Sequence, residues 1–169
     1  MTVHKSPFLR APSAGQMLGL GFTQVRLVIT GADTDGAFAM SEQPLEPKAL
    51  AGPLHTHSRE SGFIHVARGE VGAQVGDEVL HTSTGGTILI PRGTRHTFWN
   101  DSDEPARVLE LFTPAGLEAW FGELAELIGS GTYSIDDIVE SGRRFGTELE
   151  LDSLEPLLAR GLRLPGLDP

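Results

Sequence analysis

Residues 52–63 read Gly-Pro-Leu-His-Thr-His-Ser-Arg-Glu-Ser-Gly-Phe, with His55 and His57 two positions apart. On an extended segment, side chains two positions apart point to the same face, so both imidazoles are expected to project into one interior. Imidazole is a common ligand of transition metals in proteins. This stretch therefore provides half of a candidate metal site.

A second segment carries Gly85, Pro91, Gly93, His96 and Asn100. The Pro-Arg-Gly triplet at 91–93 is typical of a tight turn. His96 comes just after this turn, on a strand that we expect to run beside the first histidine segment. A third imidazole from that strand would complete a three-histidine face and would leave other coordination positions open for water or substrate.

The sequence between residues 54 and 111 predicts one short strand after another, with a turn signal between them. Gly76-Asp77 lies between two such runs and predicts a β-hairpin, and the whole chain holds 21 Gly and 11 Pro. Short strands at even spacing are typical of a β-sandwich or a closed barrel. Before this region, residues 23–30 and 37–42 also read as strands, and the two prolines of 43–48 indicate a loop.

Three parts follow from this pattern: an N-terminal arm over 1–16, a β-barrel over 17–114 and a C-terminal helical appendage over 115–169. Apolar residues of 115–128 recur at helical spacing. A second helix is predicted to begin with Ser134 as its N-cap and to stop at Gly146. Because a few short helices cannot form a core of their own, we expect the appendage to cover the barrel.

Both histidine segments resemble the two motifs of the cupin superfamily. The second matches at Gly85, Pro91, Gly93, His96 and Asn100, and the first matches at His55, His57 and Gly69. The resemblance covers roughly residues 40–115, and the remainder looks like that of the small single-domain cupins of bacteria, some of which are similar to quercetin 2,3-dioxygenases. The resemblance implies a mainly β, jelly-roll barrel that binds a metal through the three histidines. It also implies a homodimer that pairs through an edge strand and the N-terminal arm.

The chain departs from the family pattern at one ligand position. Most metal-binding cupins supply a glutamate seven residues before the glycine that ends the first motif, and here that position is Gly62. In the quercetinase-like members this glutamate is implied to take the proton of the bound substrate hydroxyl. Glu60 is therefore the candidate catalytic carboxylate if its loop bends inward, and His65 is the alternative replacement.

Without the glutamate, three neutral imidazoles leave the full charge on a divalent ion. Such a site favours an anionic, chelating ligand such as an enolate, catecholate or carboxylate. Iron, nickel, manganese, copper, cobalt and zinc all accept imidazole, so the sequence leaves the divalent metal open. Phe98 lies two residues after His96 and is expected to line the substrate pocket with Ile64 and Val66.

Composition excludes several classes of partner. The formal net charge is −10, and the 13 Lys and Arg residues are dispersed, which argues against nucleic acid. No apolar run is long enough to span a bilayer, and we read no secretory signal at the N-terminus, so the expected location is the cytoplasm. The absence of cysteine excludes thiolate ligands and a cysteine nucleophile.

The leading hypothesis is a metal-dependent dioxygenase that acts on a small aromatic or enolic, flavonol-like compound. One alternative is a non-oxidative isomerase, cyclase or lyase that uses the metal as a Lewis acid, and it predicts turnover without oxygen consumption. Another is a module that binds a small molecule and retains a vestigial site, and it predicts ligand binding with substoichiometric metal and no turnover.

Overall fold

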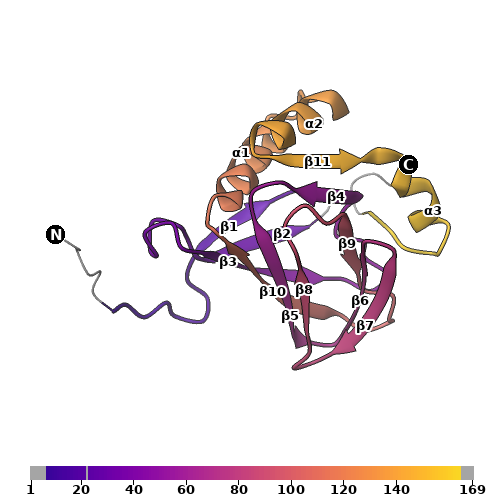
Figure 1. The fold of residues 1–169 in the computed structure, drawn as a ribbon, viewed down its shortest axis with the longest axis horizontal. Coiled ribbons are helices and arrows are strands. Elements are labelled where there is room, and N and C mark those ends of the chain that lie inside the picture. The colour runs from indigo at the N-terminus through magenta and orange to yellow at the C-terminus, as the bar shows by residue number, and fades with distance from the viewer. Residues whose placement is uncertain (1–6, 22, 165–169) are drawn as a thin grey trace.

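The structure, a computed structural model, describes residues 7–21 and 23–164. Two antiparallel β-sheets face each other and form a jelly-roll barrel (Figure 1). The six-stranded sheet has, in spatial order, β1 (Gln16–Gly19), β2 (Gln24–Ile29), β3 (Ala39–Leu45), β10 (Ala106–Thr113), β5 (Ser61–Arg68) and β8 (Thr87–Ile90). The five-stranded sheet has β11 (Thr147–Glu150), β4 (Leu54–His57), β9 (His96–Trp99), β6 (Glu70–Val75) and β7 (Glu78–Ser83). The mainly β, cupin-type fold class is confirmed.

Strand β10 illustrates why these segments become strands with one buried face. Ala106, Val108 and Phe112 alternate with more accessible residues and point inward, because side chains alternate across a strand. The predicted hairpin is also present: β6 and β7 pair from Val75↔Glu78 outward, and Gly76 adopts a positive φ of 60° in the connecting turn.

An apolar cluster fills the space between the sheets. It draws on β3, β5, β6, β8, β9 and β10 and includes Ile64, Val66 and Val108. Ile64 and Val66 were expected to line the substrate pocket, but they belong to this cluster and are not among the described residues that line the cavity. Both side chains point inward as predicted, but they pack against apolar neighbours rather than face the open space.

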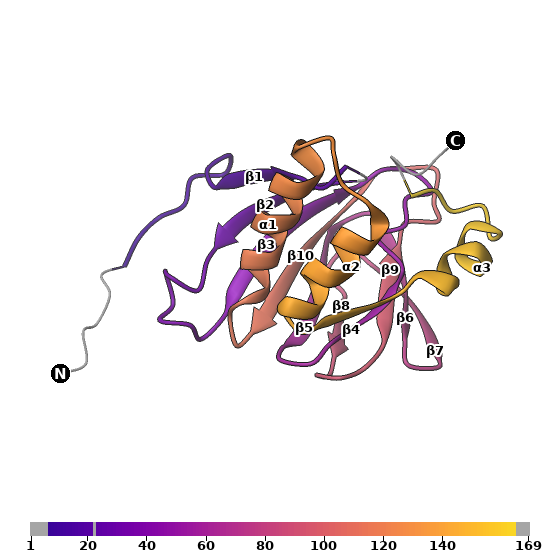
Figure 2. The same ribbon diagram turned by 90° about the horizontal axis from the view of Figure 1, so that it is seen from above.

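Helices follow the barrel strands in the chain and cover one side of it (Figure 2). They are α1 (Leu117–Gly129), α2 (Ile135–Arg144), a single 3₁₀ turn at Leu151–Ser153 and α3 (Leu154–Leu158). Ser134 is the N-cap of α2 and forms a capping box with Asp137, as the sequence predicted for the start of this helix. No helix in the described ranges is long and apolar enough to cross a membrane.

The C-terminal segment is not purely helical, because it returns one strand to the barrel. Residues of β11 pair with β4, in the register Thr147↔His57 and Leu149↔His55. A four-residue strand with mixed polarity carries too little periodicity to stand out from a loop in the sequence. The appendage is thus joined by backbone hydrogen bonds to the strand that carries two of the site histidines.

The predicted loop over 43–48 was also wrong in part, since β3 continues through Leu45. Pro44 lies at an exposed position of this strand. The ladder between β2 and β3 ends at Arg26↔Glu42, before it reaches Pro44, so no ladder hydrogen bond on that side requires the N–H that proline lacks. Of the arm expected over 1–16, residues 1–6 lie outside the described residues, and 7–15 contain no strand.

Candidate metal centre

Two neighbouring strands of the five-stranded sheet bring the three histidines together. His55 and His57 lie on β4, and His96 begins β9 directly opposite His55. The potential ligand nitrogens of the three residues lie within 4.8 Å of one another. Their ring centroids are 4.3 to 5.1 Å apart. The spacing of two residues within a strand and the pairing of adjacent strands are therefore enough to place all three imidazoles in one group.

Each imidazole is oriented by an oxygen atom beside its Nδ1 nitrogen. Nδ1 of His55 lies 2.8 Å from the carbonyl oxygen of Pro53, and Nδ1 of His96 lies 2.9 Å from that of Thr94. A carbonyl oxygen only accepts hydrogen bonds, so in both rings Nδ1 carries the proton and Nε2 carries the lone pair. Nδ1 of His57 lies 3.0 Å from the hydroxyl of Thr147 on β11.

Burial keeps these imidazoles neutral. Loss of hydration is the main reason that the pKa of His55 is lowered, that of His57 is well below its ordinary value, and that of His96 falls to about 3. The neighbouring imidazoles contribute to the lowered pKa of His57 and His96, because two like charges would face each other. Neutral imidazole is the form that binds metals.

The donor set fits a divalent transition metal. Three neutral rings converge, and the hydrogen bonds at Nδ1 leave Nε2 of His55 and His96 free to coordinate. Hydrogen bonds of this kind on the outer ring nitrogen are typical of metal-binding histidines. Three nitrogen ligands also leave positions for water or substrate, as in catalytic sites.

The proposed replacements for the missing glutamate do not join this group. Glu60 is buried, with 4% of its surface exposed, but its carboxylate lies beside Gly116 and is not part of the three-histidine cluster. Glu60 is therefore not part of the group of candidate metal ligands, and its role as a catalytic carboxylate stays a prediction. His65 lies on the outer face of β5, where its Nδ1 is 2.9 Å from the Thr87 hydroxyl. Gly62 lies on the buried face of β5, the same side as Ile64.

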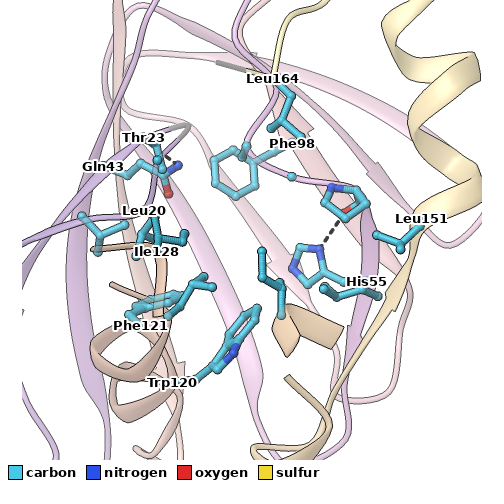
Figure 3. Close-up of a pocket in the computed structure, with 18 of the residues that line it drawn as sticks. Leu20, Thr23, Gln43, His55, Phe98, Trp120, Phe121, Ile128, Leu151 and Leu164 are labelled. Carbon is cyan, nitrogen blue, oxygen red and sulfur yellow. Dashed lines mark hydrogen bonds between the residues drawn. The ribbon is translucent and has the colours of Figure 1, made fainter. Parts of the chain in front are cut away.

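A cavity of about 350 Å³ opens beside the histidines (Figure 3). Its volume is in the range of small-molecule sites. Phe98, expected as a pocket residue, lies on its wall, and so do His55 and His57. Helix α1 contributes Trp120 and Phe121, which point toward the cavity. The rest of the wall is mainly apolar and comes from both sheets, from α1 and α2 and from the segment after β11.

Sequence reasoning missed Glu110, a carboxyl group on the cavity wall. Only 8% of its surface is exposed, and burial raises its pKa to about 7. The available signal was the alternation of β10, which places Glu110 on the same inward face as Val108 and Phe112. An ionisable residue in an otherwise apolar inward register is a candidate functional group.

Comparisons with known proteins agree with this fold. The family described as Cupin domain matches residues 41–112. An RmlC-like cupin from Shewanella frigidimarina has a similar structure, with a TM-score of 0.56 at 16% identity over 68% of this chain and 96% of that one. Residues 41–112 of this protein thus match the cupin domain family, and its barrel has the cupin-type fold.

Two fungal proteins are similar in sequence. "Probable oxidoreductase virH" of Hypocrea virens is 32% identical over 108 residues, which are 57% of this chain and 49% of that protein. "Oxidoreductase iacF" of Pestalotiopsis fici is 42% identical over 60 residues, 34% of this chain and 29% of that protein. The matched segments thus span about half of the first relative and less than a third of the second.

Proposed function

We propose that this protein is a metal-dependent oxidoreductase, specifically a dioxygenase that acts on a small aromatic or enolic, flavonol-like compound. The observation that carries the proposal is the group of three neutral imidazoles on the wall of a mainly apolar cavity of about 350 Å³. The names of both fungal relatives, which describe oxidoreductases, support the reaction class.

The cavity wall suits a flat, largely apolar substrate. Phe98, Phe112, Trp120 and Phe121 all contribute rings to it, and aromatic side chains offer faces and edges against which a substrate ring packs. The apolar wall also excludes water, which would strengthen the attraction between an anionic substrate oxygen and a divalent ion held by the histidines. A redox-active ion at the histidines supplies the oxygen chemistry that protein side chains lack.

The test is oxygen uptake by protein that has been loaded anaerobically, in separate samples, with iron, nickel, manganese, copper, cobalt or zinc. Flavonols, catechols and β-diketones form the substrate panel. We expect oxygen to be consumed with at least one redox-active metal. We expect His96→Ala to abolish this uptake, whereas His81→Ala, which changes an exposed histidine of β7, retains it.

Other results would contradict the proposal. Full metal loading without oxygen uptake across the panel would overturn the dioxygenase assignment. Conversion of an enolisable substrate without oxygen would identify an isomerase, cyclase or lyase. Substoichiometric metal with tight ligand binding and no turnover would identify a binding module.

A further inference from the structure

A stripe of polar side chains lies on the inner face of the six-stranded sheet, opposite the sheet that holds the histidines. It consists of Ser41 and Gln43 on β3 and Glu110 on β10, all buried. Ser41 and Glu110 are directly opposed in the antiparallel pairing of these strands, and Gln43 lies opposite Val108. Figure 3 shows Gln43 and His55 at separate sides of the cavity, with Phe98 between them.

These polar groups are poorly satisfied by the protein. The hydroxyl of Ser41 has no hydrogen-bond partner within the described chain. Gln43 makes one long hydrogen bond, 3.4 Å from its amide nitrogen to the Thr23 hydroxyl. Glu110 makes no side-chain hydrogen bond or ion pair with any residue that the structure describes. Gln43 and Glu110 line the cavity, and Ser41 lies beside Glu110 behind the wall. Because a buried polar group without a partner costs free energy, the two groups on the wall point to a ligand that pairs with them.

We propose that Glu110 is the group that receives the hydroxyl proton of an enolic or phenolic ligand in this cavity. The O–H bond of the ligand breaks, its electron pair stays on the ligand oxygen, and the proton forms an O–H bond with the Glu110 carboxylate. Gln43, which also lines the cavity, has an amide group that can hydrogen-bond to a second oxygen of the ligand. This assignment rests on the proposed function and names the class of its substrate.

Glu110 would supply the proton acceptor that is missing because position 62 is a glycine instead of the family glutamate. An apolar cavity next to neutral imidazoles offers few other proton acceptors. Since burial raises the pKa of Glu110 to about 7, its carboxylate is a stronger base than an ordinary glutamate. In this protein the three histidines would come from the five-stranded sheet and the base from the six-stranded sheet, so the base would lie outside the histidine motifs.

Glu60 is the rival carboxyl. It is also buried, and its Oε2 atom has no partner among the described residues. Its surroundings differ, because it does not line the cavity and the charges of Arg59, Glu118 and Arg92 act on its carboxyl group. A comparison of Glu110→Gln with Glu60→Gln therefore separates a cavity base from a buried carboxyl elsewhere.

The experiment titrates zinc-loaded protein with 3-hydroxyflavone and records its absorption spectrum, which distinguishes the neutral from the ionised flavonol. Zinc has no redox chemistry, so binding is observed without turnover. We expect the wild-type protein and Glu60→Gln to bind the ionised form. We expect Glu110→Gln to keep its zinc and its fold, as shown by elemental analysis and circular dichroism, and to lower the ionised fraction at least about tenfold. Glu78→Gln, on an exposed position of β7, is the control for the loss of one carboxylate.

Three results would overturn the inference: an unchanged ionised fraction in Glu110→Gln, a loss in Glu60→Gln instead, or a wild-type protein that holds zinc but binds only the neutral flavonol. These leave the metal site intact and so differ from failure of the proposed function, in which the wild-type protein retains no metal. If the wild-type protein retains no metal, the affinity of the metal-free protein for 3-hydroxyflavone tests the role of Glu110. Weaker flavonol binding by Glu110→Gln supports the role of Glu110, and equal binding overturns it.

Discussion

Glycine at position 62 leaves space where the family pattern has a ligand. A Cβ atom at Gly62 would lie 3.7 Å from Cβ of Ile90, an ordinary contact. Gly62 is also paired with Phe112, whose ring centroid lies 6.1 Å from that of His57. A side chain at this position would thus extend into the barrel near the histidines, without a steric conflict at its first carbon.

We therefore expect Gly62→Glu to tighten zinc binding by about tenfold or more, the factor by which supporting groups commonly change metal affinity. The matched variant Gly62→Gln has the same size without the charge and is expected to tighten binding much less. Competition with a chelator of known affinity measures both. Equal affinity of Gly62→Glu and wild-type protein would show that position 62 is not the vacant ligand site.

Glu110 links the stability of the protein to pH. Burial raises its pKa from 4.5 to about 7. Between these values the folded state holds more protons than the unfolded state, so this residue lowers the free energy of unfolding as the pH rises. We expect Glu110→Gln to be more stable than wild-type protein above pH 7, by up to about 3 kcal/mol.

Below about pH 4.5 the two proteins should converge, because the glutamate is then neutral in both states. Denaturant unfolding at a series of pH values measures the difference and cancels the contribution of the histidines, which both proteins share. A difference that stays constant from pH 4 to 8 would contradict the raised pKa of Glu110.

Strand β11 makes the C-terminal segment part of the candidate metal centre. It pairs with β4 and places the buried Thr147 hydroxyl 3.0 Å from Nδ1 of His57. Thr147→Val keeps the shape of the side chain and removes this partner. We expect it to weaken metal binding about 10- to 100-fold while the fold is retained.

The control for this variant is Thr97→Val. Thr97 is equally buried and donates a hydrogen bond of 2.7 Å to the carbonyl oxygen of Gly52, so it does not orient a histidine ring. Calorimetric zinc titrations compare the two. If Thr97→Val weakens zinc binding as much as Thr147→Val, the effect is one of general stability and not of ring orientation.

The sequence predicted some elements well because their signals are local. Gly76 identified the β6–β7 hairpin, and Ser134 identified the start of α2. The end of β3 was missed because Pro44 usually interrupts a strand, and only the pairing of the neighbouring strands shows why it is tolerated here. Strand β11 was missed because its pairing with β4 joins residues about 90 positions apart, which no local pattern reveals.

Prediction of the site had the same limit. The grouping of His55, His57 and His96 could be predicted, because it follows from the alternation of side chains along a strand and from the position of the motif turn. The position of Glu110 on the cavity wall could not be predicted in this way, because the cavity forms only when the two sheets pack together. Glu60 was a candidate because of its position in the sequence, but the loop after β4 carries it to Gly116 instead.

The whole molecule closes the cavity by placing helices against an open side of the barrel. Helix α1 packs Leu117 and Leu124 against residues of β1 and β2, and its aromatic residues reach the cavity. Helix α2 contributes Ile135 and Ile138. A ligand in the cavity would therefore contact both the barrel and the helices, and its binding should restrain the helices.

Hydrogen exchange with mass spectrometry tests this arrangement. We expect 3-hydroxyflavone to slow amide exchange in α1 and α2, because opening of these helices would require the bound ligand to lose its contacts. The β6–β7 hairpin is the internal control, since β7 contributes no residue to the cavity wall. Equal protection of the hairpin and the helices, or none in the helices, would contradict the position of the ligand.

The central claim is that His55, His57 and His96 together hold one metal ion. X-ray absorption spectroscopy of protein loaded with one equivalent of zinc measures this directly, because imidazole ligands give a characteristic scattering pattern. The account predicts three imidazole ligands in wild-type protein and a loss of imidazole scattering, with weaker zinc binding, in His96→Ala. A spectrum without imidazole ligands, or one that His96→Ala leaves unchanged, would contradict it.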